Sequence, residues 1–287
     1  MIFRIIRDHL TPEFTVRDCC RVLKVSVSGY YRWLKHPVGL REARRQELAT
    51  HIRAVFEESR RVYGSPKVHR ALRSRGVRVN RKTVARIMRA REMRPRVKRA
   101  FRPRTTESDH ALPVAANVLG REFTAPAPDT VWLCDITYIP TGEGFVYLAG
   151  VMDLFSRRIV GWSMAGHLRA ELVLDAFSMA TTRRNPGPGL LHHSDRGVQY
   201  CCGQYRAELE AWGMTPSMSR AGDCHDNAPI ESFWGILKNE LMSGREFATR
   251  EDARAAVFEY IEVFYNRTRL HSSLGYLSPE QFEAGRA

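Results

Sequence analysis

Apolar residues recur at helical spacing in the first third of the chain, where they predict two pairs of short helices. The first pair lies within residues 1–38. Thr15 can cap its first helix, and Ser28-Gly29 opens a second helix rich in aromatic residues. This spacing is typical of a helix-turn-helix unit. It is equally compatible with a helical hairpin whose aromatic side chains form a core.

The second pair has clearer boundaries and follows a longer helix. Ser65-Pro66 is a typical helix start, Gly76 makes the turn, and Asn80 can cap the second helix. Apolar residues on the inward face of that second helix are Val84, Ile87 and Met88. These features predict a second helix-turn-helix unit over residues 41–98, and this unit is strongly basic.

The pattern changes to β-strands after a basic and proline-rich stretch at residues 99–127, which we interpret as a linker that tracks a DNA backbone or is disordered. Three β-rich runs joined by short turns then predict an antiparallel meander: VWLCDITYI, GFVYLAGVMDLFS and RRIVGWSM. Alternating helices and short strands follow. We therefore expect an α/β core with a mixed sheet over residues 128–241, and a C-terminal helix and tail over 242–287.

Basic charge is confined to the front of the chain. The net charge is +14, but residues 1–110 hold 29 Lys and Arg against 10 Asp and Glu, while the remainder carries a net charge of −5. This asymmetry indicates a module that binds a polyanion, and it favours nucleic acid over a basic surface kept for solubility. The expected DNA contacts lie on the second helix of each pair: Tyr30, Arg32, Arg81, Lys82, Arg86 and Arg89.

Cysteine spacing and hydropathy limit the class of protein. The six cysteines form no C-x-x-C motif. His192-His193 near Cys201-Cys202 could suggest metal ligands, but adjacent ligands rarely converge on one ion, so we expect buried or idle thiols in a reducing compartment. No apolar run approaches the ~20 residues that span a bilayer, and no signal peptide is recognisable, which predicts a soluble intracellular protein.

Three acidic residues occupy positions where a metal site is one explanation. Asp135 lies alone in a strand that is apolar on both faces, where an unpaired charge would cost a few kcal/mol, so a metal ion or a buried arginine must compensate it. Asp195 ends a strand, where α/β sheets place their sites, although an Asp turn would also explain it. Glu231 lies in the first turn of a helix, which the helix dipole alone would favour.

The helix that carries Glu231 adds a basic residue to the candidate site. Its predicted buried stripe consists of Ile230, Phe233, Trp234, Leu237 and Leu241. Lys238 lies two turns beyond Glu231 on an adjoining face, roughly 10 Å along the axis. Three hard oxygen donors suit Mg²⁺ or Mn²⁺, and two such ions ~4 Å apart can act on a phosphodiester by in-line displacement. The neighbouring nucleotide would then lie near Lys238.

From Val131 onward the chain resembles the integrase-type core of DDE transposases and retroviral integrases. The D…D-x(35)-E pattern falls on Asp135, Asp195 and Glu231. HSDRGVQY, DNAPIESFWGILKNEL, RVLKVSVSGYYRWL and YGSPKVHRALRSRG are similar to the second-frame (OrfB) protein of the insertion-sequence-three transposases. The resemblance implies a ribonuclease H-like core, Mg²⁺ dependence, and cleavage and joining of the element's DNA ends. It also implies a basic residue seven positions after the Glu, which Lys238 matches.

The resemblance also sets the expected role and partners. We expect a DNA transposase subunit in which Asp135 and Asp195 bind a pair of metal ions, and Glu231 completes the second site. It would act as a homo-multimer on terminal repeats and target DNA, in the bacterial cytoplasm at the nucleoid. An upstream first-frame (OrfA) protein, often fused by frameshifting in that family, is an expected partner. Two other classes stay open: a DNA-binding regulator with an inactive core, and a metal-dependent nuclease without strand transfer.

Overall fold

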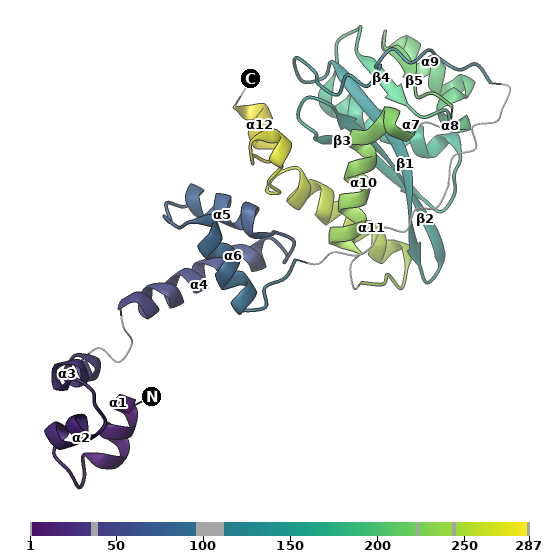
Figure 1. Cartoon of the computed structure of the whole chain (residues 1–287). Helices are drawn as coiled ribbons and strands as arrows, with labels where there is room; N and C mark the ends of the chain where they lie inside the picture. Colours follow the sequence, from purple (N-terminus) through teal and green to yellow (C-terminus); the bar gives the residue numbers. More distant parts are fainter. Residues whose placement is uncertain (1, 36–39, 96–111, 222–223, 243–244, 286–287) are drawn as a thin grey trace. The chain divides into compact units, whose positions relative to one another are not determined.

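The computed structural model describes residues 2–35, 40–95, 112–221, 224–242 and 245–285. The chain forms two compact units, Met1–Arg94 and Pro95–Ala287 (Figure 1). The first unit is all-helical, and the second contains the sheet. No helix in the described ranges is both long enough and apolar enough to cross a membrane.

The N-terminal helices enclose a small core of their own. They are α1 (Ile2–Ile5), η1 (Ile6–Leu10), α2 (Val16–Val22) and α3 (Val27–Lys35). Thr15 caps α2 as predicted, because its side chain accepts the Asp18 amide. Tyr30 on α3 is 3% exposed and packs against Ile6, Cys19 and Cys20. The expectation that Tyr30 contacts DNA is therefore wrong, whereas Arg32 is exposed and its DNA contact stays a prediction.

The second predicted helix pair is confirmed, and the helix before it packs against both members. These helices are α4 (Leu40–Glu58), α5 (Ser65–Ser74) and α6 (Arg81–Ala90). Asn80 caps α6 through the Lys82 amide, while Gly64 rather than Ser65 is the N-cap of α5. The shared core is apolar and fully covered, formed by Ile52, Phe56, Val68, Leu72, Val84, Ile87 and Met88.

A five-stranded mixed sheet in the order β3-β2-β1-β4-β5 organises the second unit. Its strands are β1 (Val131–Thr141), β2 (Gly144–Asp153), β3 (Ile159–Ala165), β4 (Leu191–Ser194) and β5 (Thr215–Met218). The first three form the predicted antiparallel meander, and β4 pairs in parallel with both β1 and β5. The central position of β1 accounts for its apolar residues on both faces. The predicted α/β fold with a mixed sheet is confirmed.

Helices cover both faces of this sheet (Figure 1). Three of them, α7 (Ala170–Arg184), α8 (Val198–Cys201) and α9 (Gly203–Ala211), close a core with the Trp132 and Cys134 face of β1. α8 and α9 are separate helices, because Cys202 between them adopts an extended backbone and its Sγ accepts the Tyr205 amide. Asp135, next to Cys134, points to the opposite face, where α10 (Ala228–Leu241) contacts β1.

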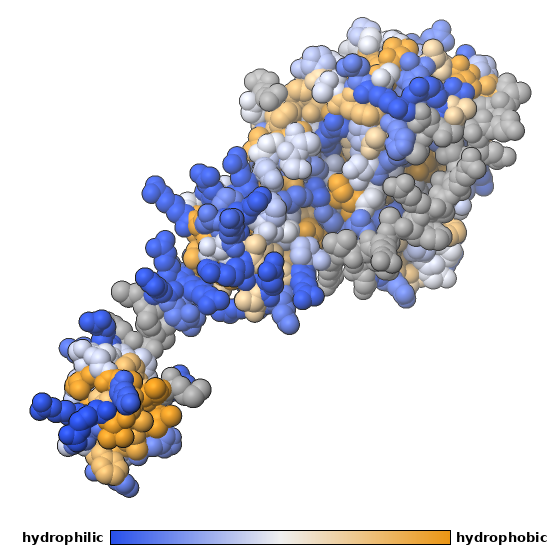
Figure 2. Space-filling model, in the orientation of Figure 1, coloured by the Kyte–Doolittle hydropathy of each residue, from blue (hydrophilic) through white to orange (hydrophobic). Residues whose placement is uncertain are grey.

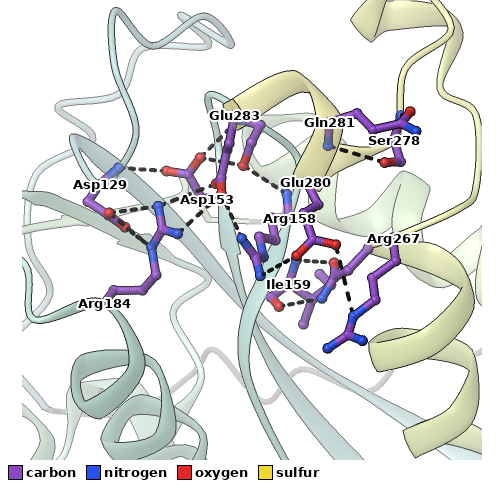
Figure 3. A network of polar contacts seen from close by, with 12 residues as sticks. Asp129, Asp153, Arg158, Ile159, Arg184, Arg267, Ser278, Glu280, Gln281 and Glu283 are labelled. Atoms are coloured by element: carbon purple, nitrogen blue, oxygen red, sulfur yellow. Dashed lines mark hydrogen bonds and ion pairs between the residues drawn. The ribbon is translucent and has the colours of Figure 1, made fainter. Parts of the chain in front are cut away.

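The C-terminal segment is part of the same unit. It continues through α11 (Arg250–Phe258), the π-helical η3 (Glu259–Tyr265), η4 (Ser272–Leu274) and α12 (Pro279–Ala284). The Asn266 amide donates to the Ile159 carbonyl at 2.9 Å and accepts its N–H at 3.0 Å, so it pairs with β3 as a strand would. Arg184 of α7 binds Asp129 and Glu283, which ties α12 to α7 and to the segment before β1 (Figure 3).

The described end of the predicted linker also belongs to this unit. Residues 99–111 lie outside the described residues. Beyond them, the amides of Val118 and Leu119 donate to Ser217 Oγ, and Met218 of β5 donates to the Ala116 carbonyl. Leu119 is 3% exposed. Residues 116–119 therefore run along the edge of the sheet, and the expectation of a linker that extends to residue 127 is corrected.

Candidate active site

The two aspartates of the candidate triad lie in register on neighbouring parallel strands. Leu133 of β1 pairs with His193 of β4, and each aspartate follows two residues later. Because adjacent strands are roughly 4.8 Å apart, this register brings Asp135 and Asp195 side by side where β4 ends. Asp195 Oδ1 accepts the Gly197 amide at 2.9 Å, so the Asp turn considered as an alternative is present together with this placement.

The Asp135 carboxylate has no ion-paired cation within the described part of the chain. Its Oδ1 accepts the Ile136 amide at 2.8 Å, its Oδ2 accepts the Trp234 indole N–H at 3.0 Å, and it forms no ion pair with any described residue. Burial, followed by the charges of Asp195 and Glu231, holds the pKa of Asp135 well above its ordinary value. The negative charges of Asp195 and Glu231 therefore each act on the Asp135 carboxylate. The buried-arginine alternative for Asp135 is wrong within the described part of the chain.

Glu231 is held near β1 by the residues that precede α10. The Asn227 side chain donates to the Cys134 carbonyl at 2.9 Å, which anchors the start of α10 beside Asp135. Asp226 is fully buried and binds Arg121 at 2.7 Å and Arg220 at 2.8 Å; these bonds hold its pKa far below the ordinary range. Sequence reasoning missed both roles. Their position in DNAPIE, immediately before the candidate Glu, was the available signal.

Lys238 faces the same site from further along α10. Its Nζ lies 4.6 Å from the centroid of the Tyr138 ring on β1. Burial lowers the pKa of Lys238, and the charge of Asp135 partly opposes that shift. The structure thus brings Lys238 within electrostatic reach of Asp135, while contact with DNA stays a prediction.

The carboxylates do not form a closed ligand cage. In the ranges that the structure describes, no three His, Cys, Asp or Glu side chains are gathered as a ready-made metal site. Mg²⁺ sites are commonly of this open kind, because the ion keeps several waters and takes phosphate oxygens of the substrate as ligands. The arrangement is therefore compatible with a metal held jointly by protein and DNA.

His192 and His193 are buried and engaged within the fold. His192 Nε2 lies 3.0 Å from Cys134 Sγ and 2.8 Å from the Tyr205 hydroxyl, while His193 bonds Ser217 and Ser219. Burial lowers the pKa of His192 to about 3. All five cysteines whose side chains are described are free thiols: Cys19, Cys20, Cys134, Cys201 and Cys202. The interpretation of these histidines and thiols as non-ligands agrees with these contacts.

The depressed pKa of His192 predicts acid sensitivity. The unfolded state binds a proton at His192 more readily than the folded state does. The folded protein therefore has its full stability with respect to this group above about pH 6.5, and the free energy of unfolding decreases by about 1.4 kcal/mol per pH unit as the pH falls towards 3. Between pH 7 and 5, His192 should account for about 2 kcal/mol of lost unfolding free energy. Urea titrations of the wild type and His192→Gln should differ in pH dependence by this amount. Equal dependence in the two proteins would refute the assignment.

Exposed basic side chains gather on α6 and on the neighbouring part of α4. The four predicted DNA contacts on α6 are exposed and form no ion pair with any described residue: Arg81, Lys82, Arg86 and Arg89. Arg86 also lines a groove with Arg41, Arg44 and Arg45 of α4. Figure 2 shows hydrophilic side chains over α4–α6. The α4 arginines were not among the predicted DNA contacts, which were placed on the second helix of each pair.

Comparisons with known proteins agree with both units. Residues 125–224 and 231–286 match family models described as integrase core domains, and residues 43–101 match an HTH-like domain. The transposase InsF for insertion sequence IS3A of Escherichia coli (strain K12) is 44% identical over 285 residues, covering 99% of this chain and 98% of that protein. The chain belongs to the InsF family of transposases. This InsF-family chain is therefore a DDE-type transposase with an HTH-like domain before its integrase core.

The InsF-family chain is also similar to a protein of another insertion element and, at much lower sequence identity, to retroviral integrases. An uncharacterized 31 kDa protein of insertion element IS600 from Shigella sonnei is 44% identical and covers 92% of this chain and 96% of its own length. A simian T-cell lymphotropic virus intasome in complex with the PP2A regulatory subunit B56 gamma is 13% identical, covering 74% of this chain and 69% of that chain (TM-score 0.47). The HTLV-2 integrase catalytic core domain in complex with magnesium is 16% identical and covers 55% of this chain and 98% of that chain (TM-score 0.42). Family membership rests on the sequence relatives.

Proposed function

We propose that this transposase cleaves DNA at the ends of its insertion sequence and joins the freed 3′-hydroxyl to target DNA, with Asp135, Asp195 and Glu231 as its divalent-metal ligands. One observation carries the proposal. Two aspartates lie in register on adjacent parallel strands, and Asp135, on which the charges of Asp195 and Glu231 act, has no ion-paired cation among the described residues. Such a cluster is costly for stability, which is expected where carboxylates serve chemistry.

The donor set fits Mg²⁺ or Mn²⁺. All three side chains offer carboxylate oxygens, and each oxygen of Asp135 accepts one protein hydrogen bond and keeps a further lone pair. Asp135, Asp195 and Glu231 would together hold the ions. When bound, two such ions would neutralise phosphate charge and favour deprotonation of the attacking hydroxyl.

The chain's own basic groups would bind and orient the DNA. Lys238, fixed above the Tyr138 ring, would contact the phosphate next to the reacting one. The exposed arginines of α6, with Arg41, Arg44 and Arg45 of α4, would bind the terminal repeats through phosphate and groove contacts. A second copy of the chain would hold the other element end, and a first-frame (OrfA) protein would be fused or associated. Action on chromosomal DNA would place the protein at the nucleoid in the cytoplasm.

Incubation of the purified chain with Mg²⁺ and labelled terminal-repeat DNA tests the proposal. We expect a nicked strand at the element end and a joined product with target DNA, both abolished on chelation of the metal. Binding without nicking would favour a regulator with an inactive core. Nicking without joining would favour a nuclease without strand transfer.

Neutralising the basic residues of α6 should weaken DNA binding and reduce its salt dependence. The slope of log K against log salt is negative, and its magnitude decreases by about 0.9 for every phosphate that is no longer neutralised. Arg86→Gln with Arg89→Gln should therefore reduce the magnitude of the slope by about 1–2. Fluorescence anisotropy with a terminal-repeat duplex measures this slope. Arg206→Gln, which removes an exposed charge from α9 in the other unit, is the control. An unchanged slope in the α6 variant would show that these side chains do not contact phosphate.

A further inference from the structure

Trp234 hydrogen-bonds directly to the candidate metal ligand on β1. Its indole Nε1 donates to Asp135 Oδ2 at 3.0 Å, and the ring is 5% exposed. The sequence assigned Trp234 to the apolar stripe of α10, where packing would be its whole role. Packing needs the ring alone, so the bond from the indole N–H calls for a separate explanation.

Gly150 on β2 makes room for this ring. Asp135 and Gly150 are register partners in the antiparallel pair, so a side chain at position 150 would point to the same face as the carboxylate. A Cβ atom at position 150 would lie 2.7 Å from Cη2 of Trp234, closer than packing allows. The strand therefore carries glycine at the position where the indole reaches across β2 to Asp135.

The same helix carries Trp234 and Glu231, which lie three residues apart and therefore less than one turn apart along its length. Asn227 anchors the start of this helix to the Cys134 carbonyl, and Trp234 binds the next residue of the strand. Glu231 lies between these two bonds in sequence. Together they fix α10 against β1 on either side of Glu231.

A neutral donor has a specific advantage at this position. An arginine or lysine bonded to Oδ2 would neutralise the carboxylate and compete with a cation for it. The indole N–H fixes the rotation of the carboxylate and leaves its full negative charge. Groups that orient a metal ligand through such bonds typically change metal affinity or activity 10–100-fold when removed.

We propose that Trp234 is a positioning residue for Asp135. Its indole N–H would orient the Asp135 carboxylate towards the metal and fix the position of that carboxylate relative to Glu231. This inference rests on the proposed metal-dependent function. The chain offers a matched control, because Trp162 on β3 donates its indole N–H to Glu262 Oε1 at 2.8 Å, a pair outside the candidate triad. Trp162→Phe removes the same kind of bond without touching Asp135.

The test compares Trp234→Phe with Trp162→Phe in the full-length chain. Phenylalanine keeps an aromatic ring over Gly150 and removes the N–H. We expect Trp234→Phe to need about 10–100-fold more Mg²⁺ for half-maximal cleavage, or to lose rate by that factor, at unchanged DNA binding. Trp162→Phe should behave as the wild type. Gly150→Ala, which displaces the ring while keeping the N–H, should share the defect of Trp234→Phe.

Fluorine NMR of the chain labelled with 5-fluorotryptophan gives a readout independent of activity. The sequence contains five tryptophans, and the Trp234 resonance is assigned by its absence in Trp234→Phe or, if that variant does not fold, by its shift in Gly150→Ala. Mg²⁺ should shift this resonance in the wild type and leave it unchanged in Asp135→Asn. An unmoved resonance at Mg²⁺ concentrations that support cleavage, or equal Mg²⁺ requirements in Trp234→Phe and Trp162→Phe, would overturn the inference. A wild type that never cleaves would instead overturn the proposed function.

Discussion

Replacing Asp135 with asparagine should reduce cleavage and joining on the order of 10³-fold or more, while DNA binding stays unchanged. Asparagine preserves the size of the side chain and one acceptor oxygen. It removes the negative charge and the second oxygen that a divalent ion would bind. Because Asp135 is repelled by Asp195 and Glu231, neutralising it should leave the unfolding free energy equal or higher. Gel assays of labelled DNA and urea unfolding measure the two effects.

If Asp135→Asn loses activity but unfolds no more easily than the wild type, Asp135 has a catalytic role and not a structural one. Asp175→Asn, an exposed acid on α7, is the matched control and should retain wild-type activity. If Asp135→Asn unfolds more easily than the wild type, the carboxylate stabilises the fold. Its loss of activity would then have a structural explanation, contrary to our account.

Replacing Arg269 with methionine should lower the unfolding free energy of the second unit by about 3–5 kcal/mol. Arg269 holds Glu240 of α10 in a bidentate pair, with Nε–Oε2 at 2.8 Å and Nη2–Oε1 at 2.7 Å. The side chains are only 6% and 11% exposed. Methionine fills similar space but leaves the buried Glu240 charge without its cation. Urea unfolding followed by circular dichroism measures the loss.

A second substitution separates the buried charge from packing. Combining Arg269→Met with Glu240→Gln removes the uncompensated carboxylate and should recover a large part of the stability, since the Tyr260 hydroxyl can still bond an amide oxygen. A loss below about 1 kcal/mol for Arg269→Met, or no recovery in the double variant, would mean that this pair does not anchor α10.

Sequence reasoning singled out Asp135, Asp195 and Glu231 because each acid stands in a context that is unusual in physical terms. Asp135 is a lone charge in a strand that is apolar on both faces, and β1 is the central strand of the sheet. The distance in sequence between Asp195 and Glu231 conveyed no geometry by itself. The two acids come near Asp135 only because β1 pairs in register with β4 and α10 packs against β1. Strand order and register depend on long-range pairing, which local patterns do not encode.

Other features depended on which of two local explanations the fold selects. The aromatic residues on α3 were compatible with either a DNA contact or a core. Tyr30 packs in the small N-terminal core. Trp234 fitted a packing stripe, and only tertiary structure brings its N–H to Asp135. Similarly, the sequence of residues 116–119 is poor in helix and strand signals. Its backbone nevertheless bonds the Ser217 side chain and the Met218 amide, which attaches it to the sheet. Side-chain partners far apart in the chain decided each case.

The most direct test of the central claim exchanges the ligand chemistry at Asp135. A thiolate is a softer ligand than a carboxylate, so it binds Mg²⁺ poorly and accepts Mn²⁺ more readily. Asp135→Cys should therefore be inactive in Mg²⁺ and regain strand cleavage in Mn²⁺, whereas Asp135→Asn should stay inactive in both. If Asp135→Cys cleaves DNA equally well in Mg²⁺ and Mn²⁺, or if Mn²⁺ restores Asp135→Asn to the same extent, Asp135 does not bind the catalytic metal and the account is contradicted.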